Sequence, residues 1–269
     1  MDFAVISRGD EVSEAKKEQV IEYLNGQGYT YNPMIPEVVI AVGGDGTVLQ
    51  AYHTYKQRLD KTAFIAYNTG HLGFYSDWDT VESLLAAIVG RRLITVEYPL
   101  VAAEIEAEGQ TVVYQALNDI TIKGAKGSVQ IDVQLNGHHF ESFKGDGLCI
   151  SSPSGSTGYN KSLGGAIVHP SLEMIQLSEM ASINNRVYRT IGSSLVIPKH
   201  HILTLLPKED TYMLSVDHES FPMDSIQHMR CYVGKEKIRF LRCRSFPFWN
   251  RVKEAFISLN DCEPRGGRE

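Results

Sequence analysis

Apolar runs and helical patterns alternate through the first hundred residues of the chain. Short apolar runs are typical of buried strands and lie at residues 3–6, 38–42 and 63–67. Helical spacing predicts helices over residues 14–25, from about residue 47, and over residues 79–90. The first of these has Ser13 as a candidate N-cap and Gly26 as a candidate C-terminal stop. Strands alternating with helices predict an α/β domain over residues 1–99 with a parallel sheet covered on both faces.

From Pro99 onward the pattern has a period of two. Alternating stretches flank a turn at Gly109, and Asn136-Gly137 between two strand-like arms is typical of a tight hairpin. Later runs such as "SSLVIP", "TYMLSVDH", "MRCYVG" and "KIRFLRC" are also short and strand-like. Residues 100–246 are therefore predicted to form a mostly β domain.

The last part of the chain returns to helical spacing. Phe248, Val252, Phe256 and Leu259 form one apolar stripe, which predicts a helix over residues 247–262 that packs back on the first domain. The final residues, 263–269, are polar and glycine-rich and are expected to be disordered.

Composition and charge exclude several classes of protein. Of 269 residues, 43% are hydrophobic and 22% charged, as in ordinary globular proteins, and the net charge of −6 gives no field that attracts nucleic acid or an anionic membrane. The four cysteines lack CxxC spacing, which argues against a disulfide scaffold or structural zinc and fits a reducing compartment. No signal peptide or membrane-length apolar run is present, so we expect a cytoplasmic protein.

A glycine-rich turn carries the first candidate chemistry. Residues 43–47 (Gly43, Gly44, Asp45, Gly46 and Thr47) follow a strand and open a helix, where bare amides and the helix dipole favour an anion. Leu49 breaks a Rossmann fingerprint, and the only Gly-Lys pair is followed by Glu236, which breaks a Walker loop. Asp45 is either an ordinary N-cap or a functional carboxylate. A second polar loop, Asn68–Phe74 with Gly70 in it, is expected at the same sheet edge, which makes a ligand crevice.

The β half adds two further candidates. Asn118-Asp119 ends a strand-like run, as either a turn or a binding pair. Residues 143–165 hold Lys144, a second Gly-Asp-Gly at Asp146, a hydroxyl and glycine run over 151–158, and Tyr159, which could stack on a flat ring. Ser154 breaks an esterase elbow, and the histidine pairs at 138–139 and 200–201 lack metal-ligand spacing and are expected at the surface.

In this order, the motifs resemble NAD kinase in its short bacterial form. The stretches similar to that family are "GGDGT" (43–47), "NTGHLGF" (68–74), Asn118-Asp119, "GDGLCISSPSGSTGYNKSLGG" (145–165) and "EMASINNRVYRTIGSSLVIP" (179–198). The Gly-Gly-Asp-Gly loop alone is shared with lipid and sugar kinases. The resemblance implies an α/β domain and a β domain with NAD bound between them. It also implies transfer of the ATP γ-phosphate to the 2′-hydroxyl of the adenosine ribose of NAD, with a divalent metal such as Mg²⁺.

The resemblance also assigns residue roles. It makes Asp45 the catalytic carboxylate, with Gly46 and Phe74 beside the substrate. Asn118 and Asp119 would hold ribose hydroxyls, and Lys144 and Asp146 would lie near the phosphates and nicotinamide. The adenosine would be lined by Ser154, Thr157, Gly158, Tyr159, Asn160, Lys161 and Ser162, with Tyr159 against the adenine. Ala181 and Ile183 would come from the neighbouring subunit of a homodimer or homotetramer.

The chain departs from the family pattern at three positions. Gly158 replaces the expected alanine, Ser154 replaces threonine, and His218 follows Asp217 where glycine is common. Two alternatives stay open: a lipid or sugar kinase that shares the loop, and a non-catalytic NAD-binding protein. An acidic chain without an apolar or basic docking segment is unlike the first, and the intact Asp45 argues against the second.

Overall fold

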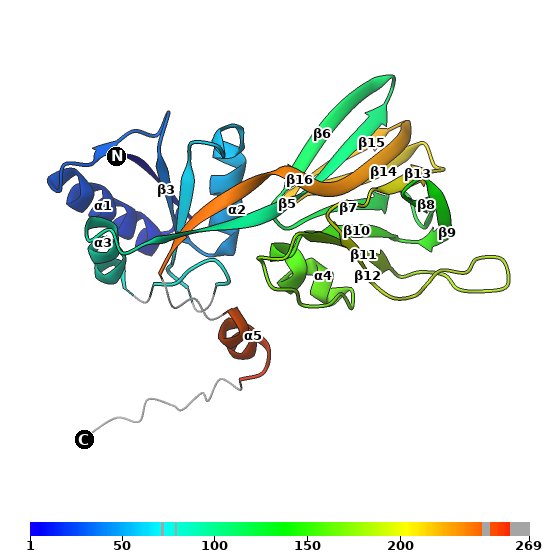
Figure 1. The fold of residues 1–269 in the computed structure, drawn as a ribbon. Coiled ribbons are helices and arrows are strands. Elements are labelled where there is room, and N and C mark those ends of the chain that lie inside the picture. Colours follow the sequence, from blue (N-terminus) through cyan, green and yellow to red (C-terminus); the bar gives the residue numbers. More distant parts are fainter. Residues whose placement is uncertain (71–72, 79, 244–247, 259–269) are drawn as a thin grey trace.

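The computed structural model describes residues 1–70, 73–78, 80–243 and 248–258. It has an α/β half and a larger β half, joined by two long strands (Figure 1). This is the predicted fold class. Within the described ranges no helix is long and apolar enough to cross a membrane.

The α/β half is built on four parallel strands in the order β2-β1-β3-β4. Their bounds are β1 Asp2–Ser7, β2 Thr30–Tyr31, β3 Val38–Gly43 and β4 Ala63–Asn68. Helices α1 (Glu11–Gly26) and α3 (Val81–Val89) pack on one face of this sheet. Helix α2 (Asp45–Tyr55) packs on the other face and is followed by a short 3-10 turn, η1 (Lys56–Arg58). The doubly covered parallel sheet is confirmed.

Two strands continue from this sheet into the β half. They are β5 (Ile94–Ala107) and β16 (Ile226–Arg242), which pair antiparallel with an irregularity between Val233 and Lys237. Phe240 of β16 also pairs parallel with Phe64 of β4. The predicted boundary between residues 99 and 100 lies within β5 beside this irregularity. The division into two domains stays a prediction, because continuous strands run through it.

The β half is a sandwich of two sheets around one apolar core. One sheet holds β5, β16, β6 (Gln110–Ala116), β13 (Leu203–Pro207), β8 (Val129–Leu135) and β9 (His138–Gly145). The other runs β12 (Leu195–Pro198), β11 (Met174–Met180), β10 (Gly147–Ser151), β7 (Asp119–Gly124), β14 (Thr211–Val216) and β15 (Glu219–Asp224). The predicted hairpin is confirmed, because Asn136 and Gly137 both have positive φ between β8 and β9.

Three sequence-based boundaries were wrong. Asp10, not Ser13, caps α1, because its carboxylate accepts the Ser13 amide at 3.1 Å, and Gly26 is the last helical residue rather than the stop. Helix α3 starts after the cap Thr80 rather than at residue 79, which is outside the described residues. The "MRCYVG" and "KIRFLRC" runs were predicted as separate short strands but belong to one strand, β16, whose pairing with β5 is irregular between Val233 and Lys237.

The C-terminal helix is shorter than predicted. Helix α5 covers Phe248–Phe256, and residues 247 and 259–269 lie outside the described residues. Among the described residues of the predicted stripe only Phe248 is buried, while Phe256 is exposed but stacks on Phe74 at a centroid distance of 5.8 Å. Lys161 of the β half lies over the same Phe256 ring at 4.2 Å, so α5 touches both halves.

Candidate active site

The turn between β3 and α2 places Asp45 at the carboxyl edge of the parallel sheet. Gly44 is the N-cap of α2 and Asp45 the first helical residue. Gly43 lies so close to Thr47 that a Cβ added to it would be 2.1 Å from the Thr47 hydroxyl oxygen. Thr47 is buried, so it would have little space to move away. The tight turn therefore requires glycine at position 43, and it presents exposed Gly46 at the start of α2.

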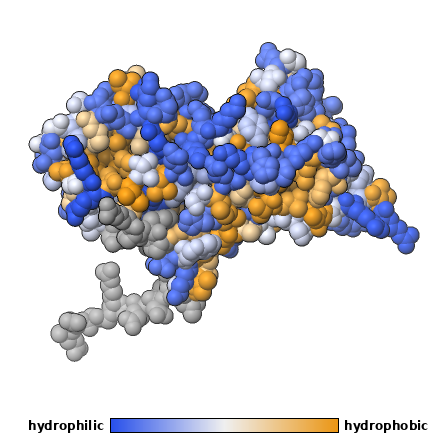
Figure 2. All heavy atoms as spheres, viewed as in Figure 1, coloured by the Kyte–Doolittle hydropathy of each residue, from blue (hydrophilic) through white to orange (hydrophobic). Residues whose placement is uncertain are grey.

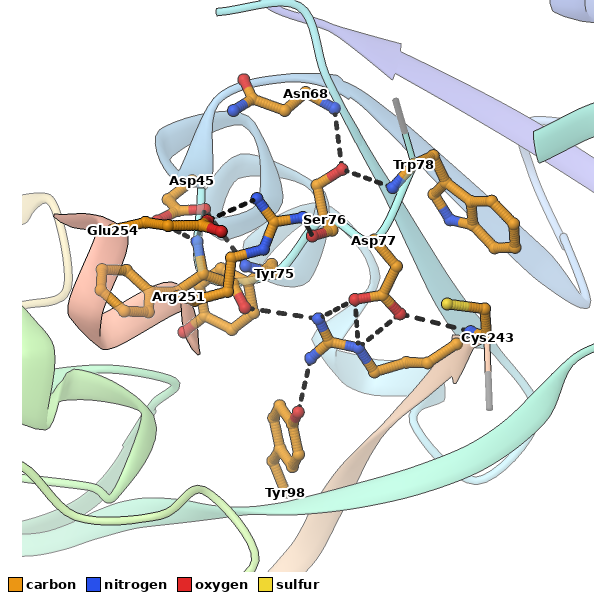
Figure 3. A network of polar contacts seen from close by, with 12 residues as sticks. Asp45, Asn68, Tyr75, Ser76, Asp77, Trp78, Tyr98, Cys243, Arg251 and Glu254 are labelled. Atoms are coloured by element: carbon orange, nitrogen blue, oxygen red, sulfur yellow. Dashed lines mark hydrogen bonds and ion pairs between the residues drawn. The ribbon is translucent and has the colours of Figure 1, made fainter. Parts of the chain in front are cut away.

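The Asp45 carboxylate does not cap its own helix, so the N-cap alternative was wrong. Its two oxygens accept hydrogen bonds from the Phe74 amide at 3.1 Å each, and Oδ1 accepts one from Tyr75 at 3.4 Å (Figure 3). A Cβ on Gly73 would lie 2.8 Å from Oδ1. The loop after β4 thus fixes the orientation of this carboxylate.

The two predicted loops share one sheet edge. Gly43 and Asn68 are paired in register at the ends of β3 and β4. The Asn68 side chain accepts the Gly70 amide at 2.9 Å, and its Nδ2 would lie 3.3 Å from a Cβ on Gly73. Residues 71 and 72 of the "NTGHLGF" stretch lie outside the described residues. The edge therefore places Asn68 beside Gly73, which lies against Asp45, and Gly70 beside Asn68.

Burial raises the pKa of the Asp45 carboxyl above its ordinary value. The Phe74 and Tyr75 amides and the charges of Arg242 and Arg251 oppose this rise. Arg242 is itself buried in an ion pair with Asp77, while Arg251 of α5 donates to the Ser76 carbonyl at 3.2 Å (Figure 3). A raised pKa makes a carboxylate a better proton acceptor, provided that it remains ionised.

Asn118 and Asp119 lie on a second segment, where the chain passes from β6 into β7, of which Asp119 is the first residue. The Tyr75 hydroxyl donates to the Asn118 side-chain oxygen at 2.7 Å, and the Tyr75 amide faces Asp45, so this one residue connects the two sites. Burial and the neighbouring Asp217 raise the pKa of Asp119 to about 7, and Lys123 partly opposes them.

A cleft of about 360 Å³ opens beside this pair. It is lined by Leu49, Asn118, Asp119, Thr121, Lys123, Tyr159, Ser215, Asp217, His218 and Ser220. Tyr159 is 40% exposed, and the Lys123 amine lies 4.6 Å from its ring centroid. The cleft therefore offers an aromatic face, two carboxyl groups and several hydroxyls, which suit a nucleoside.

The hydroxyl and glycine run packs directly against the Asn118 segment. The Ser152 amide donates to the Asn118 carbonyl at 2.8 Å, and a Cβ on Gly155 would lie 2.1 Å from that carbonyl oxygen. The run forms two short helices, η2 (Ser154–Thr157) and α4 (Tyr159–Ser162), joined by Gly158. Ser154 and Asn160 are buried, and the Asn160 side chain accepts from Ser178 at 2.7 Å. This run is therefore an ordered wall and not a flexible linker.

The remaining predicted residues form a separate group. The Ile183 amide donates to the Lys144 carbonyl at 2.7 Å, and the Asp146 amide donates to the Met180 carbonyl at 2.9 Å. Asp146, Ala181 and Ile183 are exposed, and none of the group lines the 360 Å³ cleft. Ala181 borders a different cleft of about 580 Å³.

Comparison with known proteins decides the family. The ATP-NAD kinase N-terminal domain model matches residues 8–93, and the ATP-NAD kinase C-terminal domain model matches residues 117–243. The chain belongs to the ATP-NAD kinase family.

Relatives of this family match nearly the whole chain. NAD kinase 1 of Oceanobacillus iheyensis is 52% identical over 264 residues, which are 96% of this chain and 99% of the relative. NAD kinase 1 of Bacillus subtilis is 50% identical over 269 residues, which are 97% and 100% of the two chains. The family resemblance found in the sequence motifs is thus confirmed.

Two solved structures have the same fold. Yeast NADH kinase complexed with NADH has a TM-score of 0.81 at 16% identity, covering 99% of this chain and 90% of its own. An NAD kinase from Archaeoglobus fulgidus in complex with ATP has a TM-score of 0.73 at 20% identity, covering 95% and 97%. At such low sequence identities, this structural similarity shows that the chain shares their fold, with an α/β half and a β half.

For an ATP-NAD kinase, this chain supplies no protein cage for a metal among its described residues. No group of three His, Cys, Asp or Glu side chains there could hold an ion. Magnesium in nucleotide enzymes usually keeps waters and binds phosphates with only one or two carboxylates. The carboxylates present are enough for a cation that would be held mainly by the nucleotide phosphates.

Sequence reasoning missed five residues that contact the candidate site residues or lie beside them: His53, Tyr75, Asp217, Arg242 and Arg251. Each acts through a partner far away in the chain, such as the contact of Asp217 with the Asn118 amide across 99 positions. The unusual Asp217-His218 pair was the only sequence signal for any of them.

Proposed function

We propose that Asp45 is the general base in the phosphorylation of NAD to NADP, the reaction that this ATP-NAD kinase carries out with ATP as donor. The observation that carries the proposal is the carboxylate fixed by the Phe74 and Tyr75 amides at the start of α2. A carboxylate in an anion-binding turn repels phosphate, so its presence calls for a role that offsets the repulsion.

In this proposal the bonds exchange in one step. The 2′-oxygen of the adenosine ribose forms a bond to the γ-phosphorus, and the bond from that phosphorus to the β-γ bridging oxygen breaks and releases ADP. Asp45 accepts the proton that the 2′-hydroxyl loses. The bare amides of Gly44 and Gly46 and the positive end of α2 lie where the phosphate charge would be held.

The substrates are assigned to the residues that the family resemblance names. Asn118 and Asp119 hold ribose hydroxyls beside Asp45, since Tyr75 connects the two segments. Tyr159 stacks on the adenine, with Ser154, Thr157, Gly158, Asn160, Lys161 and Ser162 around the adenosine. Gly43, Gly44, Gly46, Thr47, Asn68 and Gly70 frame the phosphates, and Phe74 lies beside NAD. A divalent cation, when bound with ATP, neutralises phosphate charge.

A second copy of the chain completes the site in this proposal. Ala181 and Ile183 are assigned to the site of the neighbouring subunit, and neither lines the cleft beside Asn118 and Asp119. Lys144 and Asp146 are assigned to the phosphates and the nicotinamide of NAD. Large apolar side chains are exposed in and around β11 and β12: Leu172, Ile183, Val187, Ile191 and Val196. Figure 2 shows hydrophobic residues along the side of the β half that holds β11 and β12. Light scattering at assay concentration should show a dimer or tetramer, and a fully active monomer would refute the shared site.

The reaction itself is tested with purified protein, ATP, magnesium and NAD. An NADP-specific dehydrogenase should report product from NAD and none from an analogue whose adenosine ribose lacks the 2′-hydroxyl. Phosphorylation of that analogue would contradict the proposal. The lipid or sugar kinase and the non-catalytic alternatives have no support from the comparisons. We also propose a reducing, cytoplasmic location, which the free buried thiols Cys149 and Cys231 support.

A further inference from the structure

The far end of α2 carries a buried contact to the β half. His53 lies on the helix that begins with Asp45, and its Nε2 is 2.9 Å from Oδ2 of Asp217. The two side chains are 7% and 0% exposed. Asp217 receives N–H donors on both carboxylate oxygens, so Nε2 of His53 is the donor in this contact.

Asp217 in turn holds the segment that carries the proposed ribose-binding pair. Its carboxylate accepts the amides of Leu117 at 3.0 Å, Asn118 at 2.7 Å and Asp119 at 3.3 Å. Its own amide donates to the Asp119 carbonyl at 2.9 Å. Asp217 has a φ of +54°, at the turn between β14 and β15. Its carboxylate is thus the common anchor of three consecutive backbone amides.

Few other groups compete for His53. The rings of Tyr52 and His218 lie perpendicular to it, each at a centroid distance of 5.1 Å. Its Nδ1 is 3.5 Å from a Glu219 oxygen and has no hydrogen-bond partner among the described residues. His218 lines the same cleft as Asp119. The strongest contact of the imidazole is therefore the one to Asp217.

We infer that His53 is a positioning residue that holds Asn118 and Asp119 in register with Asp45. We call the pair His53 and Asp217 the latch. One helix carries the proposed base at its start and one side of the latch near its end, while the amides that the latch holds belong to the β half. The latch therefore fixes the distance between base and ribose across two parts of the fold. This inference rests on the proposed function of Asp45 and Asn118-Asp119.

Two substitutions of His53 distinguish the contribution of its N–H donor from that of its ring. His53→Phe keeps a ring and removes both nitrogens, whereas His53→Gln loses the ring and keeps an N–H donor. Thr54→Ala is the matched control, because Thr54 is exposed and its hydroxyl bonds only the Gln50 carbonyl of the same helix. Each variant is compared with the unaltered chain by steady-state kinetics, thermal unfolding and amide hydrogen exchange.

If the latch positions Asn118 and Asp119, His53→Phe should weaken the interaction with NAD and leave that with ATP nearly unchanged. Leaving a buried carboxylate short of one donor should raise KM for NAD roughly tenfold. KM for ATP should stay within about twofold, because α2 and its glycine turn are unchanged. His53→Gln should recover most of the loss, and exchange at the amides of residues 117–119 should accelerate only in His53→Phe.

Other outcomes would overturn the inference. A purely structural role for His53 lowers the melting temperature and the active fraction, and so lowers kcat while KM for NAD is unchanged. Unchanged exchange at residues 117–119 in His53→Phe would show that the latch does not hold them, whatever the activity. Faster exchange with unchanged KM for NAD would show that holding them does not position substrate. Absence of NADP formation by the unaltered chain overturns the proposed function instead, and the exchange experiment still decides whether the latch holds the segment.

Discussion

Replacing Gly73 with alanine should displace the Asp45 carboxylate without unfolding the protein. The added Cβ would lie 2.8 Å from Asp45 Oδ1 and 3.3 Å from Asn68 Nδ2. To regain ordinary van der Waals contact, the carboxylate or the loop must move by roughly 0.6 Å. The carboxylate cannot move freely, because the Phe74 and Tyr75 amides hold it.

The size of the effect follows from that displacement. A misplacement of about 1 Å can cost roughly a hundredfold in rate, so kcat should fall by about ten- to a hundredfold. The melting temperature should change little, because alanine restricts the unfolded chain and so offsets part of the strain in the folded loop. Gly26→Ala is the control, since its Cβ would meet nothing within 4 Å at the end of α1. If Gly73→Ala kept kcat within about twofold at saturating substrates, the orientation of Asp45 would not limit the rate.

Three further predictions concern charge and stacking. The pKa of Asp119 is higher in the folded protein, about 7, than in the unfolded chain, about 4. The contribution of Asp119 to stability is therefore complete below about pH 4 and is lost as the pH rises through about 7. Asp119→Asn should therefore raise the free energy of unfolding, measured with urea, by more at pH 8 than at pH 5. An equal rise at both pH values would contradict the argument that burial raises the pKa of Asp119. Arg251→Gln removes a charge that lowers the pKa of Asp45, so the acidic limb of the kcat–pH profile should move to higher pH; an unmoved limb would place Arg251 outside the site. Tyr159→Ala should weaken NAD binding roughly ten- to a hundredfold by calorimetry, since stacking on an aromatic ring is worth about 1–3 kcal/mol, and an unchanged dissociation constant would show that the ring lies elsewhere.

The parts of the fold that could be predicted are those set by neighbouring residues. The buried strands β3 and β4 are continuous apolar runs, so their parallel pairing and the shared edge of their loops followed from strand and helix alternation. The start of α1 was misplaced because Asp10 and Ser13 are both good caps, and only the extended backbone of Asp10 selects it.

The parts that could not be predicted depend on residues distant in sequence. Nothing near Asp45 indicates that its partners would be amides 29 and 30 positions later rather than those of its own helix. Likewise, Asp217 anchors amides about a hundred positions earlier. The stripe on α5 predicted burial, but its Phe256 lies exposed between Phe74 and Lys161, because those two residues and not a core form its contact surface.

The most direct test of the central claim is the effect of Asp45→Asn on turnover at saturating ATP and NAD, measured together with NAD affinity. General-base catalysis is worth about 10²–10⁴-fold, so kcat should fall by at least the lower of these factors. NAD affinity should stay within a few-fold, because the amide can still hydrogen-bond the ribose. If NAD binding collapsed while kcat stayed near normal, Asp45 would be a binding residue, and if added magnesium restored most of the lost rate, it would position a metal. Either result would contradict the assignment of Asp45 as the base.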